Sequence, residues 1–271
     1  MPALKTAAEP GEVVIEIGGL SIRFWVEDAP FVRLLRERYA GFVTSVQKTQ
    51  LNFDVELISP SIDHGDADLR VEWKFGRWWM ERGDFQAEWN PETARGLVRQ
   101  TANPYSIDCV LRIVHTLLLA RKGGFLLHSA SAIRNGRAFL FAGDSGAGKT
   151  TISRLAPPDV TLLTDEISYI GQQGQSYFAF GTPFTGELGR SGENVCAHIA
   201  AVYFLAKGPE NKIEPLKPAD ACGALLKNIL CFADDPDVVH AVFQSACKFV
   251  CEVPCRRLTF APDARVWEMI V

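Results

Sequence analysis

Residues 143–150 read Gly-Asp-Ser-Gly-Ala-Gly-Lys-Thr, which matches every position of the phosphate-binding pattern G-x-x-x-x-G-K-[ST]. A triphosphate needs several backbone N–H donors around its β-phosphate, and glycines let the backbone approach without a side chain in the way. The lysine adds a positive charge for the β- and γ-phosphate oxygens, and the threonine hydroxyl can bind Mg²⁺. The pattern predicts a nucleotide site formed by Gly143, Asp144, Ser145, Gly146, Ala147, Gly148, Lys149, Thr150 and Thr151.

The segments on either side of this loop fit the same interpretation. Residues 137–142 form a short apolar run, which predicts a buried strand. Residues 150–156 can continue as a helix until Pro157 and Pro158 stop it. The sequence therefore places a strand, a glycine-rich loop and a helix in the order that a P-loop requires.

An acidic pair, Asp165 and Glu166, follows the next apolar run. Because the helix before it is short, we expect a strand over residues 160–169 to lie close to the P-loop strand and to bring both carboxylates to the phosphates. One carboxylate can hold Mg²⁺ together with Thr150, while the other accepts the proton of an acceptor hydroxyl. The alternative is a pair of carboxylates at a solvated strand end.

These segments resemble the core of the HPr kinase/phosphorylase family. The similarity lies in Leu-His-Ser-Ala-Ser-Ala-Ile at 127–133, in the P-loop and its strand, and in Leu-Leu-Thr-Asp-Glu at 162–166. It covers about residues 103–271, and it is closer to HPr-kinase-related proteins with a different N-terminal domain, which share similar segments at 181–184 and 201–209. The resemblance implies an α/β fold with a phosphoenolpyruvate-carboxykinase-like P-loop domain, and Mg-ATP as the phosphate donor for a protein serine.

Carried over by position, the resemblance implies that His128 is an active-site histidine and that Asp165 and Glu166 are the two acidic positions. A histidine among small residues near a phosphate site could donate to the γ-phosphate or assist the acidic pair. A lone histidine in an apolar strand is otherwise more often a core residue. Both interpretations of His128 stay open at this point.

The chain also departs from the family's usual pattern. It has Thr150 and Thr151 where serine and glutamate are usual, and Asp-Glu where Asp-Asp is usual. We find no clean match to the Arg-Gly-rich loop associated with phosphorolysis, so dephosphorylation and HPr as the substrate stay open. Residues 186–194, Gly-Glu-Leu-Gly-Arg-Ser-Gly-Glu-Asn, suit either a mobile lid whose Arg190 reaches the transferring phosphoryl group or an ordinary surface loop.

Composition restricts the class of partner. The chain has 271 residues, a net charge of −4 and a pI near 5.8, whereas a nucleic-acid backbone requires a basic face. No apolar run is long enough for a membrane span, and residues 1–10 lack the apolar region of a signal peptide, so we expect a cytoplasmic protein without a nucleic-acid or membrane partner. A monomer and a homo-oligomer are both compatible with the sequence.

Seven cysteines, an odd number, are typical of a reducing compartment rather than a disulfide framework. Cys247, Cys251 and Cys255 are spaced by four residues, which suggests a metal site if they lie on a helix. Residues 250–260, however, resemble a strand interrupted by Pro254, which would not gather three thiols, and no fourth ligand stands at a usual spacing. We therefore favour structural thiols.

Two domains are predicted, a smaller α+β domain over residues 1–102 and the kinase-like domain over 103–271. Residues 13–26 read as a hairpin that turns at Gly18 and Gly19, residues 28–42 as a helix, and 51–58 and 69–88 as strands. The dense aromatic residues of 73–89 could form a peptide-binding surface, but a core role is favoured. Asn103 and Pro104 begin an apolar helix that ends at Gly123 and Gly124 and marks the boundary between the two domains. Further along, the sequence predicts a helix over 218–232 and strands over 258–260 and 266–270.

The sequence thus predicts an ATP-dependent phosphotransferase that acts on a hydroxyl, most simply a serine, of a protein or peptide. Three alternatives stay open: a nucleotide-binding module without turnover, an ATPase, and a small-molecule or carboxykinase-like kinase. The last should need basic residues for an anionic substrate, for which Arg190, Arg256 and Arg257 are the candidates. The P-loop contacts phosphates and not the base, so GTP and pyrophosphate also stay open as donors.

Overall fold

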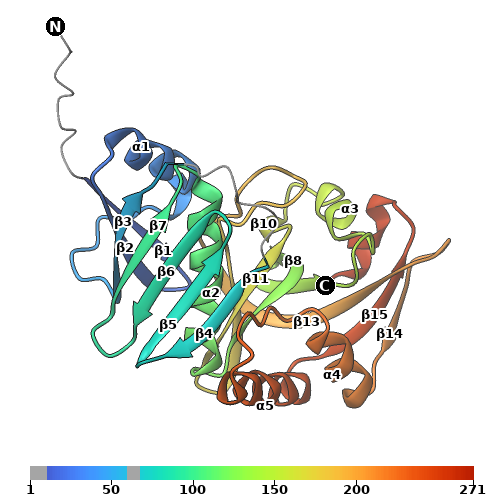
Figure 1. The fold of residues 1–271 in the computed structure, drawn as a ribbon. Helices are drawn as coiled ribbons and strands as arrows, with labels where there is room; N and C mark the ends of the chain where they lie inside the picture. Colours follow the sequence, from blue (N-terminus) through green and yellow to red (C-terminus); the bar gives the residue numbers. More distant parts are fainter. Residues whose placement is uncertain (1–10, 60–67) are drawn as a thin grey trace, which may run out of the picture. The chain divides into compact units, whose positions relative to one another are not determined.

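The structure is a computed structural model that describes residues 11–59 and 68–271 (Figure 1). The chain divides into two compact units, Met1–Leu111 and Arg112–Val271. Each unit contains one β-sheet with associated helices, so the protein is a mixed α/β protein with two sheets. The division lies inside helix α2 (Pro104–Ala120), the helix that the sequence predicts at the boundary. The roles assigned to the two predicted domains stay predictions.

Unit 1 is a seven-stranded sheet in the order β1-β2-β3-β7-β6-β5-β4. The predicted hairpin is confirmed, since β1 and β2 pair antiparallel around Gly18 and Gly19. Helix α1 (Ala29–Arg38) begins where the Asp28 carboxylate accepts a hydrogen bond from the Phe31 amide at 2.7 Å, and a 3-10 turn, η1 (Ala40–Phe42), follows. The strands are β1 (Gly11–Ile17), β2 (Leu20–Val26), β3 (Leu51–Leu57), β4 (Arg70–Lys74), β5 (Arg77–Arg82), β6 (Phe85–Asn90) and β7 (Arg95–Gln100), of which β7 was not anticipated.

The aromatic residues of unit 1 lie on both faces of this sheet. Successive side chains of a strand point to opposite faces, so only alternate positions can enter the core. Trp78, Phe85 and Trp89 are buried on one face, where Trp73 of the edge strand β4 pairs with Trp78 and stays 43% exposed. Trp79, on the opposite face, is also 43% exposed. Phe75 is 97% exposed because it occupies a two-residue turn with Gly76, and both residues have positive φ, at 51° and 76°. The prediction of an aromatic core is therefore correct for one face only.

Unit 2 contains an eight-stranded sheet. The pairings close a ring in the order β8, β11, β12, β13, β9 and back to β8, and the P-loop strand β9 lies between β8 and β13. Strand β10 pairs with β8, and β15 joins β13 to β14. The bounds are β8 (Phe125–Arg134), β9 (Arg137–Ala142), β10 (Thr161–Thr164), β11 (Ile167–Gln173), β12 (Ser176–Phe180), β13 (Cys196–Lys207), β14 (Lys212–Pro215) and β15 (Cys255–Phe260).

Alternation along β9 divides the core of unit 2 into two layers. Phe139 and Phe141 pack in one layer with Trp267, whose indole N–H donates to the Ile152 carbonyl at 3.0 Å. Leu140 and its alternate neighbours face the other layer, in which α4 and α5 lie. Because β9 is buried on both faces, the chain that leaves it at Ala142 has a fixed starting point for the phosphate-binding loop.

Several predicted elements of unit 2 need correction. The helix predicted over 218–232 ends at Leu226, and residues 250–252 belong to a long helix rather than to a strand. Residues 266–270 were predicted as a strand, yet most of them form a 3-10 helix in which Trp267 packs into the core. The helices are α3 (Lys149–Arg154), α4 (Pro218–Leu226), α5 (Pro236–Glu252) and η2 (Ala264–Met269), and α5 was not anticipated.

The cysteines of unit 2 gather around α4 and α5. Cys222 of α4 and Cys247 of α5 have their sulfur atoms 3.6 Å apart, and none of the seven cysteines, all of which lie in the described residues, forms a disulfide. Burial and neighbouring thiols raise the pKa of Cys222 to about 11, which disfavours its thiolate. Cys251 is exposed, so not every thiol is a core residue. Within residues 11–59 and 68–271, no group of three or more His, Cys, Asp or Glu side chains could hold a metal ion.

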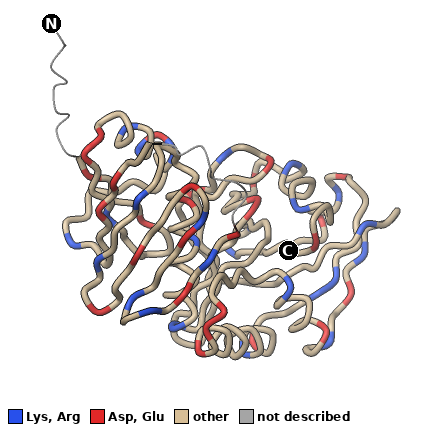
Figure 2. Tube along the Cα trace, in the orientation of Figure 1, with Lys and Arg blue, Asp and Glu red and all other residues tan. Residues whose placement is uncertain are grey.

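Charged side chains of both signs are interspersed along the chain (Figure 2). Among the helices that the structure describes, none combines the length and the apolarity that crossing a lipid bilayer requires.

His115, on α2, is a buried histidine without a hydrogen-bond partner for either ring nitrogen in the described part of the chain. Burial lowers its pKa to about 3, and its ring contacts the Tyr169 ring edge to face at 5.4 Å. In the unfolded chain His115 binds a proton below about pH 6.5, whereas in the folded chain it does so only near pH 3. Acid therefore favours the unfolded state, and we expect the free energy of unfolding to fall as pH decreases from about 6.5 toward 3.

Replacing this histidine with phenylalanine should preserve the ring contact and remove the unpaired nitrogens. For His115→Phe we expect a gain of roughly 1–3 kcal/mol in the free energy of unfolding and a weaker loss of stability between pH 7 and pH 5. Urea unfolding at the two pH values measures both quantities. An unchanged pH dependence would show that His115 is not the group responsible.

Candidate active site

The phosphate-binding loop leaves β9 at Ala142 and ends at α3. Gly146 has a φ of 77° and Gly148 a φ of 114°, backbone conformations that glycine adopts without strain. The Lys149 side chain folds back over the loop, where its Nζ donates to the carbonyl oxygens of Gly143 at 2.9 Å and Asp144 at 3.3 Å. Desolvation lowers the pKa of Lys149. The ammonium group is thus already held at the loop that would receive phosphates.

Gly148 is fixed by packing as well as by φ. A Cβ at this position would lie 2.7 Å from the Phe260 ring, whose strand borders the loop. We expect Gly148→Ala to lower the free energy of unfolding of unit 2 by about 1–3 kcal/mol. Gly223→Ala is the matched control, because an added methyl there in α4 meets nothing within 4 Å and should stabilise by about 0.5–1 kcal/mol. Urea midpoints that move equally in the two variants would contradict this account.

The register of β8 explains how the acidic pair reaches the loop. Ser129 of β8 pairs with Ala142, the residue before the P-loop, on one edge. On the other edge, His128 pairs with Ile167 and Ser131 pairs with Thr164, so the link between β10 and β11 lies beside the same part of β8. The prediction that the next strand lies close to the P-loop strand needs correction in one respect: β8 lies between them.

Asp165 is held in place by backbone amides. It is 4% exposed, and its carboxylate accepts hydrogen bonds from the Gly186 amide at 3.0 Å and the Leu188 amide at 2.9 Å. A Cβ at Gly186 would lie 2.8 Å from both Asp165 Oδ2 and Glu166 Oε2. The two carboxylates therefore converge over the backbone of residue 186, where only glycine leaves them room.

Glu166 connects the other predicted residues. Its Oε1 lies 3.9 Å from His128 Nε2, and its charge raises the pKa of Lys149, against the larger effect of desolvation. Desolvation lowers the pKa of His128, Lys149 lowers it further, and Glu166 opposes both. The imidazole is therefore mostly neutral at pH 7 and able to accept a proton or a hydrogen bond. Lys149, Glu166 and His128 therefore lie within electrostatic range of one another.

The loop after β12 is anchored at both ends rather than free. Thr182 donates through its amide to the Leu163 carbonyl at 3.1 Å, and the Glu193 amide donates to the Leu162 carbonyl at 3.0 Å. Arg190 is exposed, and within the described residues its side chain makes no hydrogen bond or ion pair. Its role at the phosphoryl group stays a prediction.

Two charged residues near the cluster were missed by sequence reasoning. Glu187 lies near enough to Lys149 to raise its pKa, and Arg112 near enough to His128 to lower that of the imidazole. Glu187 lies in the segment 186–194 that the sequence suggests as a lid, but only Arg190 of that segment was given a role. Arg112 could have been noticed, because only Asp108 shares its charged character within the otherwise uncharged α2.

The residues present fit a hard divalent cation. Mg²⁺ is commonly held by one or two carboxylates together with substrate phosphates, and it does not need an all-protein cage. The convergence of the Asp165 and Glu166 oxygens over Gly186 supplies such a donor pair. The Thr150 hydroxyl makes no side-chain hydrogen bond within the described chain and is free to act as the third predicted ligand.

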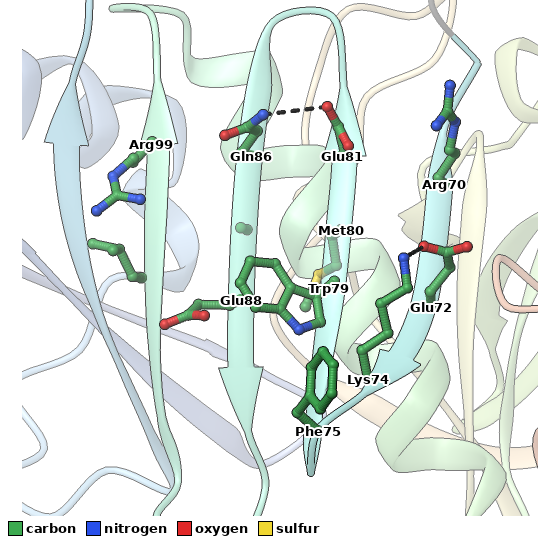
Figure 3. A pocket seen from close by; sticks show the side chains of 12 residues that line it. Arg70, Glu72, Lys74, Phe75, Trp79, Met80, Glu81, Gln86, Glu88 and Arg99 are labelled. Atoms are coloured by element: carbon green, nitrogen blue, oxygen red, sulfur yellow. Dashed lines mark hydrogen bonds and ion pairs between the residues drawn. The ribbon is translucent and has the colours of Figure 1, made fainter.

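A separate hollow of about 390 Å³ lies on the exposed face of the unit 1 sheet, across β4 to β7 (Figure 3). Trp79 and Phe75 lie at its centre, and Arg70, Lys74 and Glu72 line the β4 side. It contains none of the predicted site residues. The exposed aromatic residues keep open the peptide-binding interpretation of this stretch.

The chain folds as a mixed α/β protein in which a glycine-rich loop and its lysine lie near a pair of carboxylates. Residues 99–271 match the family model described as "SynChlorMet cassette protein ScmC", and the chain belongs to this family. The search of the curated proteins found no match.

Among solved structures, the chain is similar to the HPr(Ser) kinase/phosphatase from Coxiella burnetii, with 10% identity over 50% of this chain and 84% of that chain. The TM-score of 0.27 is too low for this likeness to define the fold or the function.

Proposed function

We propose that the protein is an ATP-dependent phosphotransferase that phosphorylates a hydroxyl group, most simply a serine, of a protein or peptide. The observation that supports this most directly is the position of Glu166, 3.9 Å from His128 and close enough to Lys149 to affect its pKa. A carboxylate between a P-loop lysine and a neutral imidazole is suited to proton transfer at the phosphate end of a nucleotide site.

In the proposed reaction the acceptor oxygen attacks the γ-phosphorus, the bond from that phosphorus to the bridging oxygen breaks, and ADP leaves. The hydroxyl proton passes to the Glu166 carboxylate, and neutral His128 orients the acceptor through a hydrogen bond. Lys149 turns from the loop carbonyls toward the β- and γ-phosphates. Mg²⁺, held by Thr150 and Asp165, would neutralise phosphate charge when bound. Unit 1 would select the acceptor through the face in Figure 3.

The proposal is tested by incubating wild type and Asp165→Ala with γ-labelled ATP, Mg²⁺ and a desalted extract of the source cells. Asp234→Ala, at an exposed aspartate of unit 2, is the matched control. Label in a discrete polypeptide with wild type and the control, but not with Asp165→Ala, supports the protein kinase. Free phosphate without labelled acceptor would favour an ATPase, and ATP binding without turnover would favour a nucleotide-binding module.

A further inference from the structure

Among the described residues, Arg112 lies near the candidate active site and has no carboxylate partner. Its guanidinium carbon lies 4.9 Å from the centroid of the Phe184 ring. Its Nε is buried and has no hydrogen-bond partner, and within residues 11–59 and 68–271 its side chain forms no ion pair. A guanidinium stays charged at physiological pH, and a buried N–H without an acceptor is destabilising. The described part of the chain therefore supplies no acceptor for this N–H and no carboxylate for this charge.

The neighbouring carboxylates do not fill this role. Asp165 is engaged by two backbone amides, and Glu166 faces His128. Phe184 lies in the loop after β12, the loop whose amides hold Asp165. Its carbonyl oxygen accepts a hydrogen bond at 3.4 Å from the hydroxyl of Thr164, the residue directly before the acidic pair. The contact with Phe184 thus fixes the guanidinium next to the acidic pair and leaves it unneutralised.

Two positive charges act on the His128 imidazole. Both Lys149 and Arg112 lower the pKa of this histidine, so two cations lie within electrostatic range of one ring. Lys149 belongs to the phosphate-binding loop and would hold the donor. Arg112 comes from α2 and packs on Phe184 of the loop after β12. Because it does not belong to the glycine-rich loop, it is left for the acceptor rather than the donor.

Resting on the proposed phosphotransferase function, we propose that Arg112 binds a carboxylate of the phosphoryl acceptor and places the acceptor hydroxyl beside His128 and Glu166. A planar guanidinium can bind a carboxylate through two parallel hydrogen bonds, which fixes orientation as well as position. The acceptor is accordingly an anionic hydroxyl compound, either a free hydroxy acid or an acidic peptide segment around a serine.

The test measures binding by calorimetry with Mg²⁺ and a non-hydrolysable ATP analogue present at saturation, so that the P-loop is filled. Two matched pairs of probes distinguish the two sources: glycerate against glycerol, and a capped Asp-Ser-Asp peptide against a capped Asn-Ser-Asn peptide. The variants are Arg112→Met, which removes the guanidinium and its charge but keeps a long unbranched side chain, and Arg112→Lys, which keeps the charge. Arg121→Gln, at an exposed arginine just after α2, is the matched control.

We expect either glycerate or the Asp-Ser-Asp peptide to bind about 10- to 100-fold more tightly than its neutral counterpart, glycerol or the Asn-Ser-Asn peptide. This preference should appear in both wild type and Arg121→Gln. The preference should vanish in Arg112→Met and be partly retained in Arg112→Lys. Equal binding of charged and neutral probes in wild type, or a preference that survives in Arg112→Met, would overturn the proposal. Should Arg112→Met not fold, a preference in Arg112→Lys as large as that of wild type overturns it, and a reduced one supports it.

The same experiment separates this inference from the proposed function. If the ATP analogue does not bind, the phosphotransferase proposal fails, and titration of the probes against the nucleotide-free protein still decides whether Arg112 binds a carboxylate. If the analogue binds and the carboxylate preference is absent, only the role of Arg112 is overturned.

Discussion

Replacing Lys149 with alanine is expected to weaken ATP binding by about 100-fold or more. Lys149 is 8% exposed and its ammonium group is held at the loop by the Gly143 and Asp144 carbonyls, so it has only to turn from these carbonyls toward bound phosphates. Calorimetric titration with Mg-ATP measures the loss. In the same variant the pKa of His128 should rise, because the positive charge that lowers it is gone.

Lys122→Ala provides the matched control, since this lysine of unit 2 is exposed. It should bind ATP as wild type does and leave the His128 titration, followed by NMR, unchanged. An ATP affinity of Lys149→Ala within threefold of wild type would mean that the loop does not hold nucleotide phosphates, and the proposed function would then fail at its first step.

Glu166→Gln should lower kcat by roughly 10²- to 10⁴-fold, because the amide cannot accept the hydroxyl proton. The KM for ATP should change much less than kcat, since the P-loop is intact. The pKa of His128 should move further below 6.5, because Glu166 is the charge that raises it. Labelled-phosphate transfer at saturating ATP and NMR titration of the imidazole measure these effects.

The control for this variant is Glu193→Gln, at an exposed glutamate of the loop after β12. Its kcat and its His128 titration should match wild type. If Glu166→Gln kept most of its turnover, another group would have to accept the proton, and Asp165 would be the next candidate.

Local chemistry made part of the fold and site predictable. The glycine and lysine positions of the P-loop, the buried run of β9 and the caps at Asp28 and Asn103 involve neighbours within a few residues. Such contacts depend on backbone conformation and short-range hydrogen bonds, which residue type and spacing specify directly. The joint position of Lys149, Glu166 and His128 was also anticipated, but it came from the family resemblance as much as from spacing.

Other features required tertiary contacts that residue types do not specify. Asp235 and Pro236 do signal locally the start of the helix that ends at Glu252, but its end is not signalled in the same way. Residues 264–269 form a 3-10 helix in which the Trp267 indole reaches the Ile152 carbonyl, a contact between distant segments. The pairing of β8 with β10 and β11 and the amides that hold Asp165 follow from segments far apart in the chain. So does the position of Arg112 on Phe184, without a carboxylate partner among the described residues.

The sequence by itself indicated the glycine-rich loop between β9 and α3, because its backbone geometry is a local property of the glycines and the flanking strand. The tertiary structure alone decided which charges surround that loop and which of them lack a partner, since charge pairing depends on distances between residues that only the folded sheet brings together.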